Sequence, residues 1–110
     1  MNQSQEVGVI GAGSFGTAVA NLLAEKSPVI LVASNEAQAN IIRSSNQSAG
    51  QKLNANIQVT HDLQHLASNC KVIFPIIPSQ DFYSCMVDLQ PYLNADHILI
   101  HGTMGKPPLL

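Results

Sequence analysis

Residues 7–20, VGVIGAGSFGTAVA, decide the fold of this chain. A short apolar run leads into the pattern Gly-x-Gly-x-x-Gly, which leads in turn into an Ala-rich segment with helical spacing. A strand, a glycine turn and a helix in this order predict a dinucleotide-binding loop. Gly11 permits the tight turn, Gly13 lets a pyrophosphate approach the backbone, and Gly16 lets the helix pack close to the sheet. The alternative is a Gly-rich connection that binds no ligand.

Apolar runs alternate with helical patterns along the rest of the chain. The expected strands are Glu6–Ile10, Val29–Ala33, Ile57–Thr60, Val72–Ile77 and His97–Ile100. The expected helices are Ser14–Lys26, a segment capped by Asn35 that ends near Ser44, a short segment capped by Asp62, and Ser79–Tyr92. Strands that alternate with helices predict right-handed crossovers. The expected fold class is therefore α/β, a doubly wound parallel sheet (Rossmann) in a single domain over residues 1–110.

Two segments fit this pattern less well. Pro75 lies inside the fourth expected strand, where a proline cannot donate to a ladder. That strand is therefore either distorted at Pro75 or paired on one side only. Residues 46–56 are polar and are expected to form an irregular loop, with Gly50 at a turn.

Ligands of such sheets bind beyond the carboxyl ends of the strands. Four expected strand exits share that rim, namely Gly11–Gly16, Ala33–Glu36, Ile77–Phe82 and His101–Lys106. At the second exit, a site for NAD alone usually presents an acidic residue to the ribose hydroxyls, about 20 residues beyond the glycines. Ala33-Ser34-Asn35 stands there, with neither an acid nor an arginine. This exit therefore predicts no strong choice between NAD and NADP.

Composition and charge exclude several classes of protein. With a net charge of −2 and no basic run, the chain lacks the footprint of a nucleic-acid-binding protein. No apolar stretch reaches about 18 residues, so no membrane span is expected, and residues 1–6 are unlike a secretory signal. Cys70 and Cys85 are expected to be reduced thiols of a cytoplasmic chain. The four histidines have no metal-ligand spacing, so no metal site is expected.

Four motifs follow one another along the chain. They are Gly-Ala-Gly-Ser-Phe-Gly-Thr-Ala at residues 11–18, Asn-Ile-x-x-Thr-x-Asp-Leu at 56–63, Pro-Ser-x-x-Phe at 78–82 and His-Gly-Thr-Met-Gly at 101–105. Together they resemble the N-terminal domain of bacterial NAD(P)-dependent glycerol-3-phosphate dehydrogenase, in which the last motif normally ends in Thr-Lys-Gly. The motifs stand in that family's order and span nearly the whole chain.

The resemblance implies a cytoplasmic oxidoreductase of glycerophospholipid metabolism. It implies hydride exchange between NAD or NADP and the pair glycerol 3-phosphate and dihydroxyacetone phosphate, with protein cations polarising the carbonyl. The implied partners are a nicotinamide dinucleotide and, in the full-length enzyme, a small phosphorylated substrate, with a homodimer as a candidate assembly. The implied cofactor-binding residues are Gly11, Ala12, Gly13, Ser14, Phe15, Gly16, Ser34, Asn35, Pro78, Ser79 and Gln80.

Several of these expected contacts have a structural alternative. Ser14 would donate to the pyrophosphate and Phe15 would flank the dinucleotide, or the first is a helix N-cap and the second a core residue. Ser34 and Asn35 would bond to the cofactor's ribose, or they cap the second helix. Ser79 would contact the cofactor, or it serves only as the N-cap of the helix that follows.

Three features depart from the family's pattern. The lysine of Thr-Lys-Gly, which the resemblance implies to contact substrate and nicotinamide, is Met104 here, and a thioether is neither a cation nor a proton donor. Lys106 lies close by but out of register, so no catalytic residue is intact. Since the sequence ends at Leu110, the helical C-terminal substrate domain is expected to be absent; in the family it supplies a second catalytic lysine, the substrate phosphate site and most of the dimer interface. The usual Tyr-Leu-Pro element is shortened to Gly50–Leu53.

Two other functions stay open at this point. One is another hydroxyacid-type dehydrogenase with the same nucleotide domain, which sequence beyond Leu110 would distinguish. The other is a dinucleotide-binding module without catalysis, which Met104 and Pro75 favour. In either case the 110 residues alone are expected to be inactive.

Overall fold

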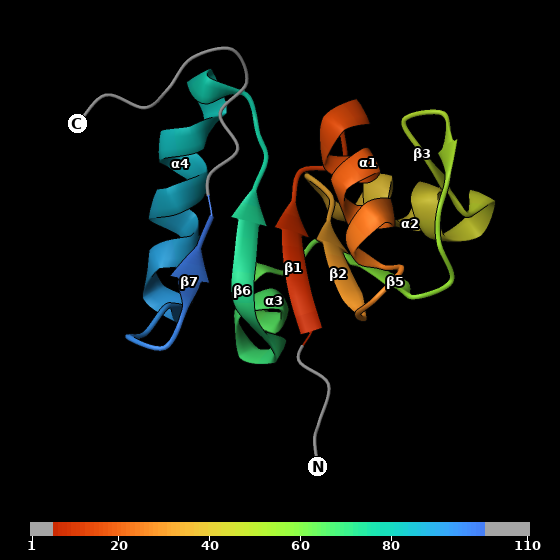
Figure 1. Ribbon diagram of the computed structural model, residues 1–110. Coiled ribbons are helices and arrows are strands. Elements are labelled where there is room, and N and C mark those ends of the chain that lie inside the picture. The colour runs from red at the N-terminus through yellow and green to blue at the C-terminus, as the bar shows by residue number, and fades with distance from the viewer. Residues whose placement is uncertain (1–5, 101–110) are drawn as a thin grey trace.

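The computed structural model describes residues 6–100, which form a five-stranded parallel sheet with helices on both faces (Figure 1). The strands stand in the order β5-β2-β1-β6-β7. They are β1 (Glu6–Ile10), β2 (Val29–Val32), β5 (Ile57–Thr60), β6 (Cys70–Pro75) and β7 (Ile98–Leu99). The helices are α1 (Ser14–Leu23), α2 (Glu36–Ser45), α3 (Leu63–Asn69) and α4 (Ser79–Leu89), followed by the short 3₁₀ helix η1 (Gln90–Tyr92). This is the predicted doubly wound Rossmann class.

The strand order reverses at β1, in the middle of the sheet. From β1 the chain moves outward to β2 and β5, crosses back to β6 and continues outward to β7. β1 therefore pairs in parallel with β2 on one side and with β6 on the other. In such sheets a crevice forms beyond the carboxyl ends of the strands at the point of reversal. The topology thus places a crevice above β1 and β6.

Two apolar layers enclose the sheet. One layer packs Ala20 of α1 and Ile42 of α2 against the strands. The other packs Leu66 of α3 and Leu89 of α4 against the opposite face, and alternate residues of β2 belong to alternate layers. All of β2 is buried, as a continuous apolar run predicts. Each fully buried aliphatic side chain of this kind contributes about 1.5–3 kcal/mol to folding.

Several boundaries and caps confirm the sequence prediction. β1 and β5 have the predicted bounds. The Asn35 side chain accepts a hydrogen bond from the amide of Gln38, and the Asp62 side chain accepts from the amides of Gln64 and His65. Both residues are therefore the N-caps that their position before a helix predicts.

Other boundaries differ from the prediction. α1 ends at Leu23 rather than Lys26, and the chain ahead of Pro28 is tightened by bonds such as that from the Lys26 amide to the Leu23 carbonyl. The predicted helix 79–92 changes to 3₁₀ geometry after Leu89, where Pro91 has no amide to continue the α-helical bonds. β2 and β7 are shorter than predicted, and β6 begins and ends earlier.

Pro75 is the last residue of β6 and is paired on one side only. The amide of Ile76 donates to the Ile10 carbonyl at 2.8 Å, so Ile76 faces β1. Successive residues of a strand face opposite neighbours, so the nitrogen of Pro75 faces β7. There the β6–β7 pairing has already stopped at Ile73 and Leu99. This confirms the second predicted alternative, namely that the strand is paired on one side only at Pro75.

Residues 47–53 are ordered, so the prediction of an irregular loop was wrong. β3 (Gln47–Ser48) and β4 (Gln51–Lys52) form an antiparallel hairpin, with Gly50 at the turn in the left-handed region at φ 78°. Leu53 is buried in the core. Because a two-stranded hairpin is at best marginally stable by itself, its order comes from contacts with α1 and with the glycine loop that precedes α1.

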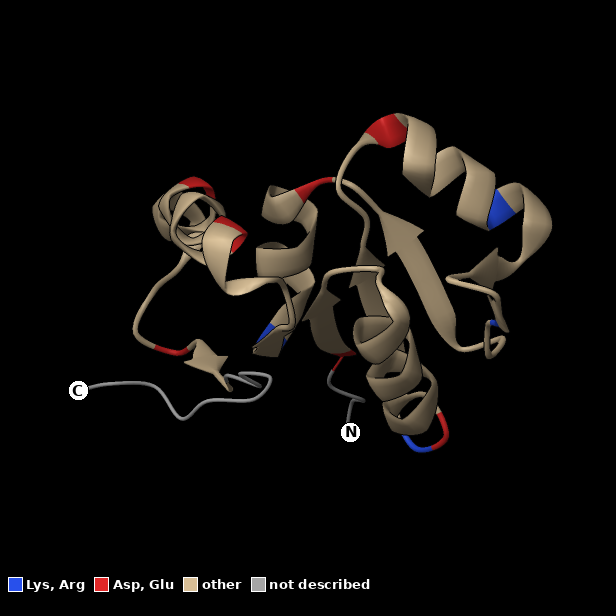
Figure 2. Ribbon diagram, turned by 90° about the horizontal axis from the view of Figure 1, so that it is seen from above, with Lys and Arg blue, Asp and Glu red and all other residues tan. Residues whose placement is uncertain are grey.

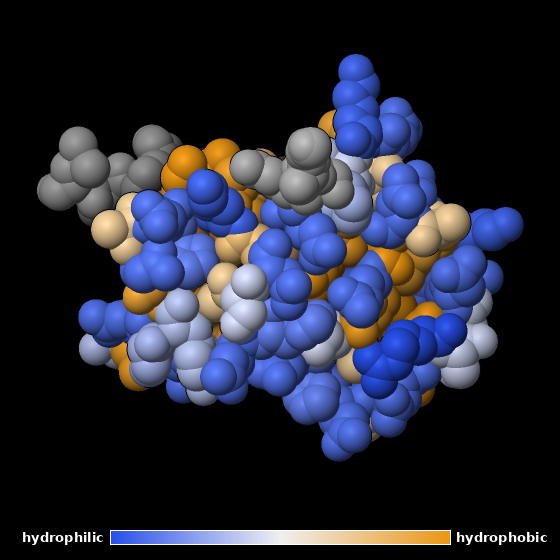
Figure 3. Space-filling view, turned by 90° about the horizontal axis from the view of Figure 1, so that it is seen from below, coloured by the Kyte–Doolittle hydropathy of each residue, from blue (hydrophilic) through white to orange (hydrophobic). Residues whose placement is uncertain are grey.

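The surface of the described part is mostly polar but carries few charges. Figure 2 shows Lys, Arg, Asp and Glu scattered along the ribbon, without a basic cluster. Figure 3 shows the end where the strands begin, covered largely by hydrophilic side chains with apolar patches between them. Among residues 6–100, no helix has both the length and the apolarity that crossing a membrane requires.

Candidate functional site

A cavity of about 570 Å³ opens at the carboxyl ends of β1, β2 and β6. Its wall contains Gly11–Gly13 after β1, Ala33 and Ser34 after β2, and Ile76–Pro78 after β6. Three of the four predicted strand exits therefore meet at one cavity, which lies where doubly wound sheets bind their ligands.

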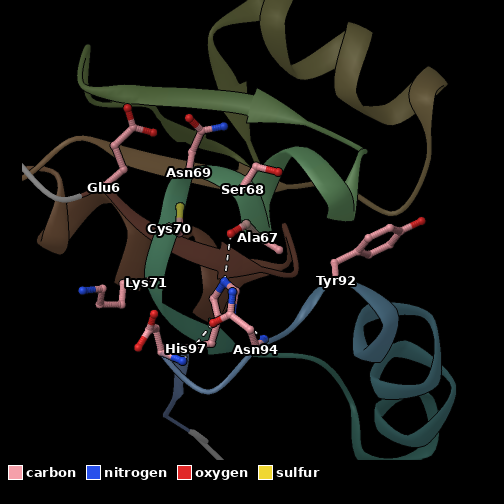
Figure 4. A pocket seen from close by; sticks show the side chains of 10 residues that line it. Glu6, Ala67, Ser68, Asn69, Cys70, Lys71, Tyr92, Asn94 and His97 are labelled. Carbon is pink, nitrogen blue, oxygen red and sulfur yellow. Dashed lines mark hydrogen bonds between the residues drawn. The ribbon is translucent and has the colours of Figure 1, made fainter.

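A larger cavity of about 640 Å³ lies at the opposite end of the strands (Figure 4). There the amide of Asn94 donates to Nδ1 of His97 at 3.0 Å, and Nε2 of His97 lies 2.8 Å from the Ala67 carbonyl oxygen. Because Nδ1 accepts, Nε2 carries the proton and donates. Nδ1 thus holds a turn within the segment before β7, and Nε2 joins that segment to α3. The smaller cavity, at the carboxyl ends, is the candidate site.

Gly11 and Gly16 are required by the protein's own backbone. Gly11 has φ 114°, and a β-carbon there would lie 2.1 Å from the Ile76 carbonyl oxygen. At Gly16 a β-carbon would lie 2.0 Å from the Gly11 carbonyl oxygen. Because Gly16 has no β-carbon, α1 can pack closely on the turn that precedes it, in agreement with the close helix packing predicted for Gly16.

No contact within residues 6–100 gives such an explanation for Gly13. Its φ of −75° suits any residue, and a β-carbon there would have no atom within 4 Å. Gly13 lines the cavity, so that β-carbon would project into open space at the candidate site. The missing side chain therefore leaves room for something other than this chain, and a pyrophosphate fits the position.

The start of α1 supports neither structural alternative, that Ser14 is an N-cap or that Phe15 is a core residue. The N-cap is Gly13, without a side-chain cap, and Ser14 is the first helical residue. Phe15 is 44% exposed, so it is not a core residue. No acidic residue stands in the first turn. The free amides and the positive end of the helix dipole are thus available to an anion.

At the exit of β2, the two predicted residues belong to a helix cap. Oδ1 of Asn35 accepts from the Gln38 amide at 2.8 Å. In return, Oε1 of Gln38 accepts from the amide and from the hydroxyl of Ser34, both at 2.9 Å. This confirms the capping alternative for Asn35. Ser34 and Gln38 also line the cavity, where the Gln38 NH₂ group and a lone pair of the Ser34 hydroxyl are left for a ligand.

At the exit of β6, the structural alternative that Ser79 serves only as an N-cap was wrong. Pro78 holds the cap position, with φ −55° and ψ 145°, and Ser79 is the first helical residue. Pro78 lines the cavity. Ser79 and Gln80 are exposed at the start of α4, and neither is among the residues that line the cavity.

Sequence reasoning missed one wall of the cavity. Asp81, Ser84, Cys85 and Asp88 line it from α4. Their spacing of three and four residues is that of one helix face, which the predicted helix could have shown. Gln38 was missed as well, although a Gln three residues after an Asn cap is a known capping pattern.

The thiol of Cys85 in this wall is not an activated nucleophile. Burial, with a smaller contribution from Asp88, raises the pKa of the Cys85 thiol. The thiol is therefore protonated at neutral pH, and a thiol is a much weaker nucleophile than a thiolate. His61 also lines the cavity. Met104 and His101 lie outside the described residues.

A model of the family "NAD-dependent glycerol-3-phosphate dehydrogenase N-terminus" matches residues 6–107. The chain belongs to this family. The match selects the family over the other hydroxyacid-type dehydrogenases that the sequence alone left open.

Individual relatives of the family agree with this assignment. The glycerol-3-phosphate dehydrogenase (NAD(P)+) of Brachyspira hyodysenteriae is 30% identical over 103 residues, which cover 90% of this chain and 31% of that protein. The enzyme of the same name from Pseudomonas paraeruginosa is 34% identical over 112 residues, which cover 96% and 32%. The crystal structure of glycerol-3-phosphate dehydrogenase from Coxiella burnetii shares the fold at a TM-score of 0.85, with 22% identity over 93% of this chain and 33% of that one. The chain thus spans about a third of the length of these family members.

Proposed function

We propose that this domain binds NAD or NADP at the carboxyl ends of β1, β2 and β6, as the cofactor half of a glycerol-3-phosphate dehydrogenase. The open space at Gly13 carries the proposal, because no contact within residues 6–100 accounts for a glycine there. The family to which the chain belongs is named for dependence on NAD. A bound nicotinamide cofactor would supply the hydride chemistry.

The chain's own residues would hold the cofactor in two places. The pyrophosphate would lie over Gly11–Gly13 and accept from the amides that open α1, beside Ser14 and Phe15. The adenosine ribose would lie at the exit of β2, where Ser34 and Gln38 offer hydrogen bonds to its hydroxyls. Pro78, with Ser79 and Gln80 behind it, would flank the nicotinamide half.

The proposed activity of the whole enzyme is hydride exchange between NAD(P)H and dihydroxyacetone phosphate, giving glycerol 3-phosphate. A small phosphorylated substrate, a homodimeric assembly, the cytoplasm and glycerophospholipid metabolism belong to the same proposal. The names of relatives that this chain matches over about a third of their length support the activity, and the other parts of the proposal follow only from the family resemblance of the motifs.

A dinucleotide-binding module without catalysis is the second candidate. Met104 favours it, because it replaces the lysine that the family's Thr-Lys-Gly motif carries. The two candidates share the cofactor site and differ only in turnover.

Replacing Gly13 by Val tests the cofactor site. The valine side chain would occupy the space where the pyrophosphate is proposed to bind, so NADH affinity should fall more than about tenfold in a fluorescence titration. Circular dichroism should still show a folded chain, because no atom of residues 6–100 lies within 4 Å of a β-carbon placed there.

Gly16→Ala provides the matched control. Its β-carbon would meet the Gly11 carbonyl oxygen at 2.0 Å, so this variant should lose thermal stability. Equal NADH affinity in the wild-type chain and in Gly13→Val would remove the basis of the cofactor assignment.

A further inference from the structure

A buried pair of hydroxyls joins the β3–β4 hairpin to the glycine loop. Thr17 of α1 is fully buried, and Ser48 of β3 is 3% exposed. Their oxygens lie 2.8 Å apart, and the Ala12 carbonyl oxygen lies 3.0 Å from Ser48 Oγ and 3.3 Å from Thr17 Oγ1. The bond between the two hydroxyls can run either way: when Thr17 donates to Ser48, Ser48 donates to Ala12, and when Ser48 donates to Thr17, Thr17 donates to Ala12.

This network fixes the direction of one peptide group. In a trans peptide the carbonyl and the following N–H point in opposite directions from one plane, and residues 6–100 contain no cis peptide bond. The Ala12 carbonyl is held toward α1 and the hairpin, so the Gly13 N–H points away from them. Gly13 lines the cavity, and within the described part of the chain its amide has no acceptor.

We propose that Thr17 and Ser48 are positioning residues for the dinucleotide: by holding the Ala12 carbonyl, they keep the Gly13 N–H aimed at the pyrophosphate. The ligand named here rests on the proposed function. Without these hydroxyls the peptide between Ala12 and Gly13 would turn more freely, because glycines at 11 and 13 restrict the neighbouring dihedrals little. The anion would then have to order a donor that is otherwise already in place.

The hairpin has other anchors that do not touch Ala12. Nδ2 of Asn21 donates to the Lys52 carbonyl at 3.0 Å, and Oδ1 of Asn21 accepts from the Asn54 amide at 2.8 Å. Asn21 therefore holds the hairpin to α1 at a distance from the glycine loop. This separates a role in docking the hairpin from a role in orienting the peptide.

NADH titration of four variants of the chain tests the proposal. Ser48→Ala and the isosteric Thr17→Val should each weaken NADH binding about fivefold to tenfold, which corresponds to one lost hydrogen bond to an anion-binding group. Thr17→Ser keeps the hydroxyl and should stay within about twofold of the wild type. Asn21→Ala should lower the melting temperature through loss of the hairpin anchor, with NADH affinity within about twofold.

The NMR signal of the Gly13 amide in the ligand-free protein provides a second measurement. It should be single and sharp in the wild type and in Asn21→Ala, and shifted or broadened in Ser48→Ala and Thr17→Val. Should Ser48→Ala fail to fold, the two Thr17 variants answer the same question. If the wild type does not bind NADH, the proposed function fails, while the amide signal still tests the orientation of the peptide.

Two results would overturn the proposal. One is an equal loss of NADH affinity in Asn21→Ala and Ser48→Ala, which would mean that hairpin docking matters in general. The other is a Gly13 amide signal that is unchanged when either hydroxyl is removed.

Discussion

The physical reason for a glycine differs among the three glycine positions of the Gly-x-Gly-x-x-Gly motif. Carbonyl oxygens of the protein stand where the β-carbons of residues 11 and 16 would be, whereas open space surrounds that of residue 13. Substitution should therefore separate stability from binding within a single motif. A sequence pattern alone assigns these roles by analogy, and the structure shows which of them follow from the chain's own packing.

Cofactor choice at the exit of β2 should be weak. Ser34 and Gln38 form hydrogen bonds there, but this exit offers neither a carboxylate to repel a 2′-phosphate nor a cation to bind it. We expect the affinities for NADH and NADPH to lie within about one order of magnitude, or about 1.4 kcal/mol. Ser34→Arg should shift the preference toward NADPH by about tenfold or more through a charge-assisted contact. A preference above about a hundredfold in the unmodified chain would mean that another group decides.

Among the elements, β6 carries a buried thiol near its start. Burial, with a smaller contribution from Glu6, raises the pKa of Cys70 from its ordinary value of 9.0 to about 12. Between these values the unfolded chain releases the thiol proton while the folded chain keeps it. The unfolded state then binds fewer protons, so the free energy of unfolding falls as the pH rises. Below the ordinary pKa this contribution to stability is complete.

Cys70→Ala should therefore flatten the alkaline loss of stability. Urea unfolding at about pH 8 and at about pH 10.5 would measure it. The wild type should lose more stability between the two pH values than the variant does, even if the variant is less stable at both. Equal losses in the two proteins would show that Cys70 does not contribute to the alkaline transition.

How far the sequence predicts an element depends on the range of the contacts that order it. β1, β5 and the Asp62 cap follow from local patterns and were predicted. The β3–β4 hairpin was not, because its order depends on contacts between distant residues, such as Ser48 with Ala12. The site shows the same division. The glycine loop has a local signature, whereas the sequence shows that Ser84 and Cys85 share a helix face but not that this face of α4 lines the cavity.

At the scale of the whole molecule, the expected activity of these 110 residues is limited to cofactor binding. The 110 residues span about a third of the matched relatives. We expect this polypeptide to bind cofactor without converting dihydroxyacetone phosphate. Met104 removes a cation that is typically worth about a hundredfold or more in rate, and the family's substrate domain lies outside these residues.

Restoring Met104→Lys should therefore not give activity by itself. Fusion of the variant to a C-terminal domain of the family should be needed as well, because that domain brings the substrate close to the cofactor. NADH oxidation with dihydroxyacetone phosphate provides the assay. A rate above the no-enzyme background from the unmodified chain would contradict this expectation. It would mean that Lys106 or His101 carries the chemistry assigned here to absent residues.

The contact between Ser48 and Ala12 has a thermodynamic consequence that runs in the reverse direction. The proposal holds that the bond from Ser48 to the Ala12 carbonyl raises affinity for the dinucleotide, so linkage requires the dinucleotide to strengthen that bond by the same factor. The turn at Gly50 would then report on a site it does not touch. Amide hydrogens of β3 and β4 should exchange more slowly in the presence of NADH, and proteolysis at the turn should slow by a similar factor, so occupancy of the cavity can be followed from the far side of α1.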